Sequence, residues 1–178
     1  MKQEETMRWM KNTYRPTHFI SIQLPHERKT DKLCECEMDI KFLMKLMEKE
    51  LLGRRWSTKF YRFAVIYEEG EKGLLHAHVV LSCPDRDTLE IDDAMTKAGD
   101  HYRRLYRTQK APDIHVEDIY NEEGPFGYCS KQLDEYRLQR IRSNWLSTSE
   151  TMFDRHSRRP LNVSLAFENI CTRLNDRN

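Results

Sequence analysis

Two alternating apolar runs joined by a short acidic turn constrain the fold of this chain most strongly. The runs cover residues 59–67 and 74–81, and the sequence Glu-Glu-Gly-Glu-Lys-Gly fills residues 68–73 between them. Successive side chains of a strand point to opposite faces of a sheet, so two such runs around a glycine-containing turn predict an antiparallel β-hairpin. The parity of each run then decides which side chains share a face.

Other segments with strand or helix patterns lie on both sides of this hairpin. They are a strand over residues 18–24, a helix over 37–52, a helix over 88–109, a strand over 113–120 and a helix over 124–139. This order predicts an α+β protein. At 178 residues we expect a single domain, with a core over about residues 16–140 and a C-terminal extension over 141–178 to which the sequence assigns no role.

The composition is that of a globular protein. Hydrophobic residues make up 38% and charged residues 33%, and no apolar stretch approaches the roughly 18 residues of a membrane span. Residues 1–11 lack the apolar core of a secretory signal, and the five cysteines have no framework spacing, so we expect free thiols in an intracellular protein. The net charge of +1 is low for a nucleic-acid binder, although basic residues gather in local clusters.

The second arm of the hairpin carries the sequence His76-Ala77-His78, the most informative candidate site. The odd-numbered residues from 75 to 81 are apolar, so both imidazoles should lie on the opposite face. By the same parity Glu68 on the first arm faces the histidines, whereas a β-bulge at the turn would substitute Glu69. The alternative interpretation is two half-buried histidines beside two solvated turn glutamates.

Two imidazoles and one carboxylate can hold a metal ion and leave coordination positions open for a substrate. Mixed nitrogen and oxygen sites accept Mg²⁺ or Mn²⁺, and zinc binds such ligands too. We expect Mn²⁺ or Mg²⁺ because the other motifs favour phosphodiester chemistry.

Tyr128 and Lys131 lie three residues apart, on one face of the helix predicted over 124–139. A tyrosine can act as a covalent nucleophile if a nearby cation assists it, and Lys131 supplies such a charge. Without the histidines, Tyr128 would be interpreted as a packing residue of an amphipathic helix.

Two clusters of arginines could bind a nucleic-acid backbone. They comprise Arg103, Arg104 and Arg107, and Arg137, Arg140 and Arg142. Such clusters neutralise phosphates, but each cluster alone is also typical of a solvated helix surface.

These motifs in this order resemble those of the HUH endonucleases. The sequence Phe-Ile-Ser-Ile-Gln at residues 19–23 comes first, then the acidic residues with His76 and His78, then Tyr128-Cys129-Ser130-Lys131. The form Tyr-x-x-Lys looks like that of the single-tyrosine rolling-circle replication initiators of plasmids and small circular DNA viruses. The resemblance covers roughly residues 18–135.

The resemblance implies both a fold and an activity. The fold would be a ferredoxin- or RRM-like, five-stranded antiparallel sheet with the histidines at its centre, helices on one face and the tyrosine helix across the other. The activity would be metal-dependent, sequence-specific nicking and joining of single-stranded DNA. Tyr128 would form a 5′-phosphotyrosine bond, while the metal would be held by His76, His78 and Glu68. Lys131 would steady the phosphate or a nearby water.

Some features of the sequence depart from other branches of that family. Gln132 stands four residues after Tyr128, so we expect a single nucleophile. Tyr102 and Tyr106 have the two-tyrosine spacing but precede the last predicted strand, and we interpret them as packing or DNA-stacking residues. The chain has no phosphate-binding loop of the Gly-x-x-x-x-Gly-Lys type, so a separate helicase would unwind the DNA.

Partners and alternatives follow from the same resemblance. We expect single-stranded or origin-hairpin DNA as the partner, no membrane, and a monomer or weak oligomer. The protein would be cytoplasmic in a bacterium and nuclear if it came from a eukaryotic virus. Two other functions stay open: a transposase or relaxase with the same chemistry, and a non-catalytic nucleic-acid-binding module. A relaxase would place its tyrosine before the histidines, where Tyr14 is available, but the flanking Arg15-Pro16 does not resemble a nucleophile helix.

Overall fold

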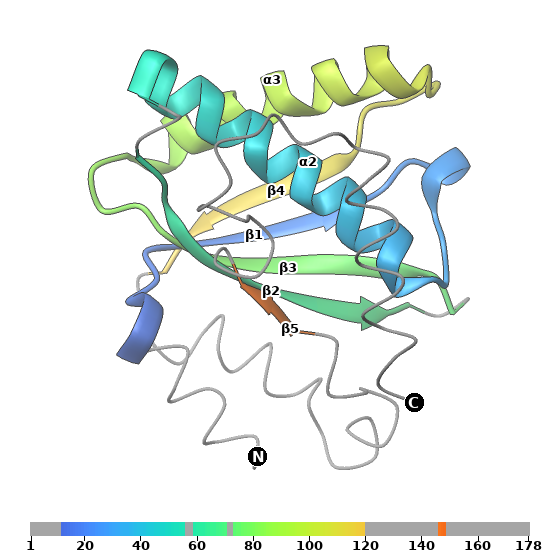
Figure 1. The fold of residues 1–178 in the computed structure, drawn as a ribbon, viewed down its shortest axis with the longest axis horizontal. Helices are drawn as coiled ribbons and strands as arrows, with labels where there is room; N and C mark the ends of the chain where they lie inside the picture. Colours follow the sequence, from blue (N-terminus) through green and yellow to red (C-terminus); the bar gives the residue numbers. More distant parts are fainter. Residues whose placement is uncertain (1–11, 56–58, 71–72, 120–145, 149–178) are drawn as a thin grey trace.

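The computed structural model describes residues 12–55, 59–70, 73–119 and 146–148. Its strands are β1 (His18–Gln23), β2 (Arg62–Glu69), β3 (Leu75–Ser82), β4 (Asp113–Asp118) and β5 (Leu146–Thr148), and its two long helices are α2 (Leu33–Leu52) and α3 (Thr88–Tyr106). Two short 3-10 turns, η1 (His26–Arg28) and η2 (Gly53–Arg55), follow β1 and α2. Figure 1 shows α2 and α3 lying across one side of the sheet.

The strands form one antiparallel sheet in the order β4-β1-β3-β2-β5. Four strands have six to eight residues, and the three-residue β5 pairs with β2 at one edge. The hairpin predicted from the two alternating runs is β2–β3, and β3 is the central strand of the sheet. The expected α+β class with an antiparallel sheet is confirmed.

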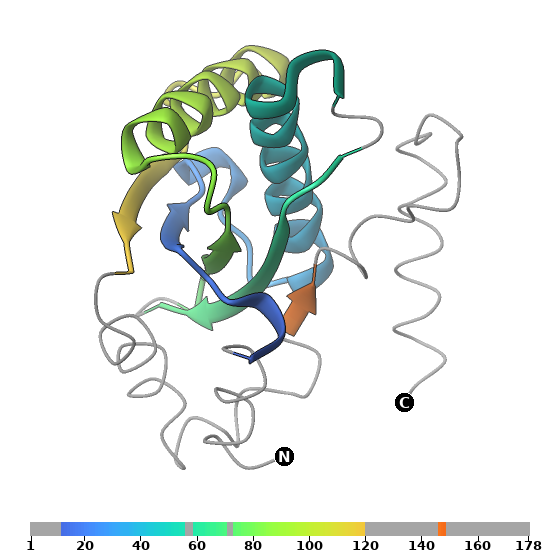
Figure 2. The same ribbon diagram turned by 90° about the vertical axis from the view of Figure 1, so that its left-hand side faces the viewer.

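The main apolar core lies between the sheet and the two helices. Odd-numbered residues of the hairpin supply the sheet side of this core, and the methionine-rich face of α2 together with α3 supplies the other side. Its fully buried members include Phe63, Val65, Tyr67, Ala77, Val79, Leu43, Met44, Met47 and Met95. The opposite face of the sheet carries only a smaller apolar cluster among the described residues, formed by Tyr14, Phe19, Ala64 and Val80. Figure 2 shows both helices on the same side of the sheet.

Several element boundaries differ from the predicted ones. Helix α2 begins at Leu33, four residues earlier than predicted, because its first turn packs the fully buried Cys36 against the core. Helix α3 ends at Tyr106 because Arg107 adopts a left-handed conformation with φ of 54°. Its start is fixed by a capping box in which Asp87 and Glu90 bond to each other's backbone N–H groups.

The hairpin turn is also shorter than predicted. Strand β2 begins at Arg62 and continues through Glu68 and Glu69, which the sequence had placed in the turn. Strand β4 ends at Asp118, two residues before the predicted end. The helix predicted over 124–139 lies outside the described residues.

Within the described residues, no helix combines the length and apolar character needed to cross a membrane. Cys34, Cys36 and Cys83 are free thiols, as expected. Burial raises the pKa of both Cys36 and Cys83 to about 12, so these two thiols stay protonated at neutral pH.

Candidate metal centre

The pairing of β2 with β3 brings Glu68 and the two histidines together. Glu68 lies directly opposite His76, and Ile66 lies opposite His78. Neighbours of these residues on the same strands, Tyr67 and Ala77, are fully buried under the helices. Because side chains alternate along a strand, Glu68, His76 and His78 point away from the helices. The face assignment made from strand parity is confirmed.

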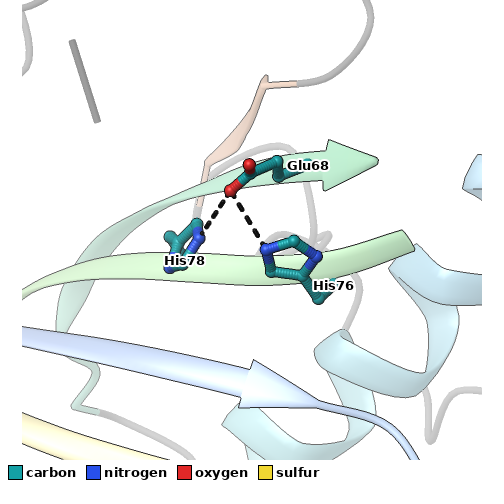
Figure 3. A group of neighbouring side chains, drawn as sticks. All are labelled: Glu68, His76 and His78. Carbon is teal, nitrogen blue, oxygen red and sulfur yellow. Dashed lines mark hydrogen bonds and ion pairs between the residues drawn. The ribbon is translucent and has the colours of Figure 1, made fainter. Parts of the chain in front are cut away.

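The three side chains converge on one oxygen atom (Figure 3). Nε2 of His76 and Nε2 of His78 each lie 3.0 Å from Oε2 of Glu68. The two imidazole rings meet edge to face, with centroids 5.0 Å apart. The side chains of Glu68, His76 and His78 are 15%, 23% and 7% exposed, so the cluster is enclosed but still reached by solvent.

The histidines determine the electrostatics of the carboxylate. Burial raises the pKa of Glu68, but the hydrogen bonds from His76 and His78, together with their charge, outweigh this effect and lower that pKa to about 2. Glu68 is therefore ionised at neutral pH and offers a negatively charged oxygen between two nitrogen donors.

The donor atoms fit a divalent cation. One ligand atom from each of Glu68, His76 and His78 lies within 4.8 Å of the others, and within the described part of the chain this is the one group of three or more such residues that could hold a metal ion. Ligands about 2.1 Å from an octahedral ion and at right angles to each other are about 3.0 Å apart, which matches the two nitrogen–oxygen distances here. These three residues are therefore the ones that would hold the ion.

Glu69 does not belong to this group. Strands β2 and β3 pair without interruption from Arg62 opposite Ser82 to Glu69 opposite Leu75, so the bulge that would have substituted Glu69 is absent from this hairpin. Glu69 is exposed and has the opposite parity to Glu68. Of the two glutamates that the sequence left open, Glu68 is the one beside the histidines.

Strand β1 adds two contacts that sequence reasoning missed. Oγ of Ser21 lies 3.1 Å from Nδ1 of His78, and the ring of Phe19 stacks on the His78 ring with centroids 5.3 Å apart. Both residues belong to the short motif at positions 19–23, and their spacing of two residues places them on the same face of a strand. The sequence contained no signal for which strand pairs with β3.

The arginines of α3 lie away from this cluster. Arg103, Arg104 and Arg107 are exposed at the C-terminal end of α3, in the helical layer on the other side of the sheet. Tyr102 on the same helix is fully buried, so it is a packing residue and the DNA-stacking role is wrong for it.

The remaining predicted site residues fall in a part of the chain that the structure leaves undescribed. They are Tyr128, Lys131, Arg137, Arg140 and Arg142. Tyr14, the alternative tyrosine, is 4% exposed and packs with Phe19 and Val80 on the sheet face that carries the histidines.

Comparison of the chain with protein-family models, curated proteins and solved structures finds no significant match. The interpretation of the cluster therefore depends on its own geometry and chemistry.

Proposed function

We propose that this chain is a metal-dependent endonuclease and strand-transferase for single-stranded DNA, of the HUH type, that initiates rolling-circle replication of a plasmid or small virus. The observation that carries the proposal is the convergence of Glu68, His76 and His78 on the face of the central strands that α2 and α3 leave uncovered. The resemblance to this family implies a ferredoxin- or RRM-like fold in which the helix of Tyr128 crosses that face.

The donor set supports this chemistry. A divalent cation held by these side chains would act as a Lewis acid on a scissile phosphate. Glu68 supplies the negative charge that binds the cation, and the two imidazoles on a rigid strand fix the direction from which a phosphate approaches. The ligands come from one hairpin, so the remaining coordination positions stay open to a substrate.

The covalent step belongs to Tyr128. Its phenolic oxygen forms a bond to phosphorus, the bond from phosphorus to the 3′ oxygen breaks, and the phenolic proton ends on that 3′ oxygen. The products are a 5′-phosphotyrosine and a free 3′-hydroxyl. Because the new bond retains the phosphoester, a second 3′-hydroxyl can reverse the step and join two ends. In this proposal Lys131 steadies the phosphate.

A covalent adduct tests the proposal directly. The full chain is incubated with random single-stranded oligonucleotides and Mn²⁺, and adducts that survive detergent are counted and sequenced. We expect adducts from the wild-type protein that disappear with a chelator and in Tyr128→Phe. Tyr136→Phe, a tyrosine eight residues further on, is the matched control and should retain them.

Other results would contradict the proposal in different ways. DNA binding without any adduct would support the non-catalytic binding module. Adducts that persist in Tyr128→Phe but disappear in Tyr14→Phe would move the nucleophile to the N-terminal side of the histidines, as in the relaxase alternative.

A further inference from the structure

Strand β1 lies beside β3 and presents two side chains to the His78 ring. Ser21 is directly opposite His78 in the pairing of these strands, and Phe19 is two residues earlier on the same face. Both Phe19 and His78 are buried. Neither Phe19 nor Ser21 belongs to the group of ligand atoms around Glu68.

These two contacts restrict different motions of the ring. The Phe19 ring lies nearly parallel to the imidazole, at an interplanar angle of 15°, and so fixes the plane of the His78 ring. Ser21 bonds to Nδ1 at 3.1 Å, which fixes the rotation of the ring within that plane. With Nδ1 held by Ser21, Nε2 is the nitrogen that faces Oε2 of Glu68.

We propose that Phe19 and Ser21 are positioning residues that hold the His78 ring ready for a metal ion. This inference rests on the metal site of the proposed function but not on DNA cleavage. Its consequence is that β1, which supplies no ligand, controls the metal affinity of a site built on β2 and β3. Partners of this kind around metal-binding histidines commonly affect affinity by about 10- to 100-fold.

A hydroxyl suits this position because it both donates and accepts hydrogen bonds. In a neutral His78 ring whose Nε2–H group donates to Glu68, Nδ1 can accept a hydrogen bond from the Ser21 hydroxyl. If an ion were held at Nε2, the proton of the neutral ring would lie on Nδ1 and could be donated to Oγ of Ser21. Ser21 therefore keeps its bond to His78 in both states.

The test measures Mn²⁺ affinity by calorimetry on the full chain, with Ser21→Thr and Ser21→Val as the decisive pair. Both replacements are β-branched and similar in volume, but only threonine retains the hydroxyl. We expect Ser21→Val to lower Mn²⁺ affinity by about 10- to 100-fold and Ser21→Thr to stay within a few-fold of the wild type. Ser82→Val is the matched control, since Ser82 lies on the same face of β3 four residues beyond His78, and it should change affinity little.

Two further readouts separate positioning from a general loss of structure. The thermal midpoints of the metal-free Ser21→Thr and Ser21→Val proteins should agree within a few degrees. Nitrogen chemical shifts of the His78 ring should report a single tautomer in metal-free wild type and Ser21→Thr, and a mixture in Ser21→Val. Ser21→Ala, which needs no extra space, gives the same comparison if Ser21→Val fails to fold.

The outcomes distinguish this inference from the proposed function. If Ser21→Val and Ser21→Ala bind Mn²⁺ as tightly as the wild type while His78→Ala does not bind it, the positioning role is refuted and the metal site stands. If the wild type itself binds no Mn²⁺, both are refuted. DNA is absent from the assay, so failure to nick DNA leaves this result unaffected.

Discussion

Replacing Glu68 with glutamine removes the charge at the centre of the cluster while nearly preserving its shape. Lowering the pKa of Glu68 from 4.5 to about 2 corresponds to at most about 3 kcal/mol of folded-state stability at neutral pH. Solvent reaches the carboxylate, whose side chain is 15% exposed, and this screening reduces the effect. We therefore expect Glu68→Gln to destabilise the metal-free protein by about 1–3 kcal/mol.

Thermal unfolding with and without metal measures both effects of this substitution. For a domain of this size, each kcal/mol of lost stability lowers the thermal midpoint by about 2–4 °C. In a chelating buffer at neutral pH, the midpoint of Glu68→Gln should therefore be about 2–12 °C below that of the wild type. At a concentration of 100 Kd, Mn²⁺ should stabilise the wild type by about 2.7 kcal/mol and Glu68→Gln much less.

The pH dependence gives a second signature. Because the pKa of Glu68 is lowered in the folded state, its stabilising effect is complete above about pH 4.5 and is lost as the pH falls toward 2. The difference in stability between wild type and Glu68→Gln should therefore shrink across that range.

Glu69→Gln is the matched control, since it makes the same charge change at the next residue of the same strand. It should shift stability by no more than about 0.5 kcal/mol, because Glu69 is exposed and outside the cluster. Equal effects of the two substitutions, with and without Mn²⁺, would refute the electrostatic reasoning and the face assignment together.

Three further predictions concern the rest of the molecule. Arg28→Met removes the bidentate partner of Asp39, whose side chain is 1% exposed. It should lower the free energy of unfolding, measured in urea, by about 3–5 kcal/mol, and a decrease below about 1 kcal/mol would contradict the importance of this pair. Gly99→Ala should raise the free energy of unfolding by about 0.5–1 kcal/mol, because alanine is favoured over glycine inside a helix such as α3. The added Cβ would lie 3.6 Å from both Ile114 and Pro112, an ordinary contact distance, and a lower thermal midpoint would show that α3 and β4 are packed too closely for it. Neutralising Arg137, Arg140 and Arg142 together should weaken DNA binding about equally for all sequences and flatten its salt dependence, as expected of contacts to phosphates. Unchanged binding at low and high salt would leave these arginines as a solvated surface and would direct the same test to Arg103, Arg104 and Arg107 on α3.

The β2–β3 hairpin could be predicted from the sequence down to the faces of its side chains. Its alternation has a period of two residues and is local, so residues 59–82 alone indicate that Glu68, His76 and His78 share a face. The elements on either side could be predicted in type but not in length. The end of α3 illustrates this limit, since the helix stops where Arg107 adopts a left-handed backbone that no residue preference indicates.

Contacts between distant segments could not be predicted in the same way. Ser21 and His78 are 57 residues apart, and their hydrogen bond depends on β1 pairing with β3 and on the register of that pairing. The ion pair of Arg28 with the buried Asp39, with the Tyr102 hydroxyl beside it, likewise requires η1, α2 and α3 to pack together. Periodicity within one segment contains no information on such neighbours.

The geometry of the candidate metal centre is a consequence of how the core packs on the other face of the same strands. A slip of β2 by one residue against β3 would place Glu69 opposite His76, and it would also turn Phe63, Val65 and Tyr67 out of the core. Exposing three such side chains costs about 5–9 kcal/mol, which is comparable to the whole stability of a domain of this size. The core thus excludes the alternative register, and Glu68 is held opposite His76 without any contribution from a bound ion. A site fixed in this way should keep its arrangement in the metal-free protein, so metal binding to Glu68, His76 and His78 should proceed without refolding of the hairpin.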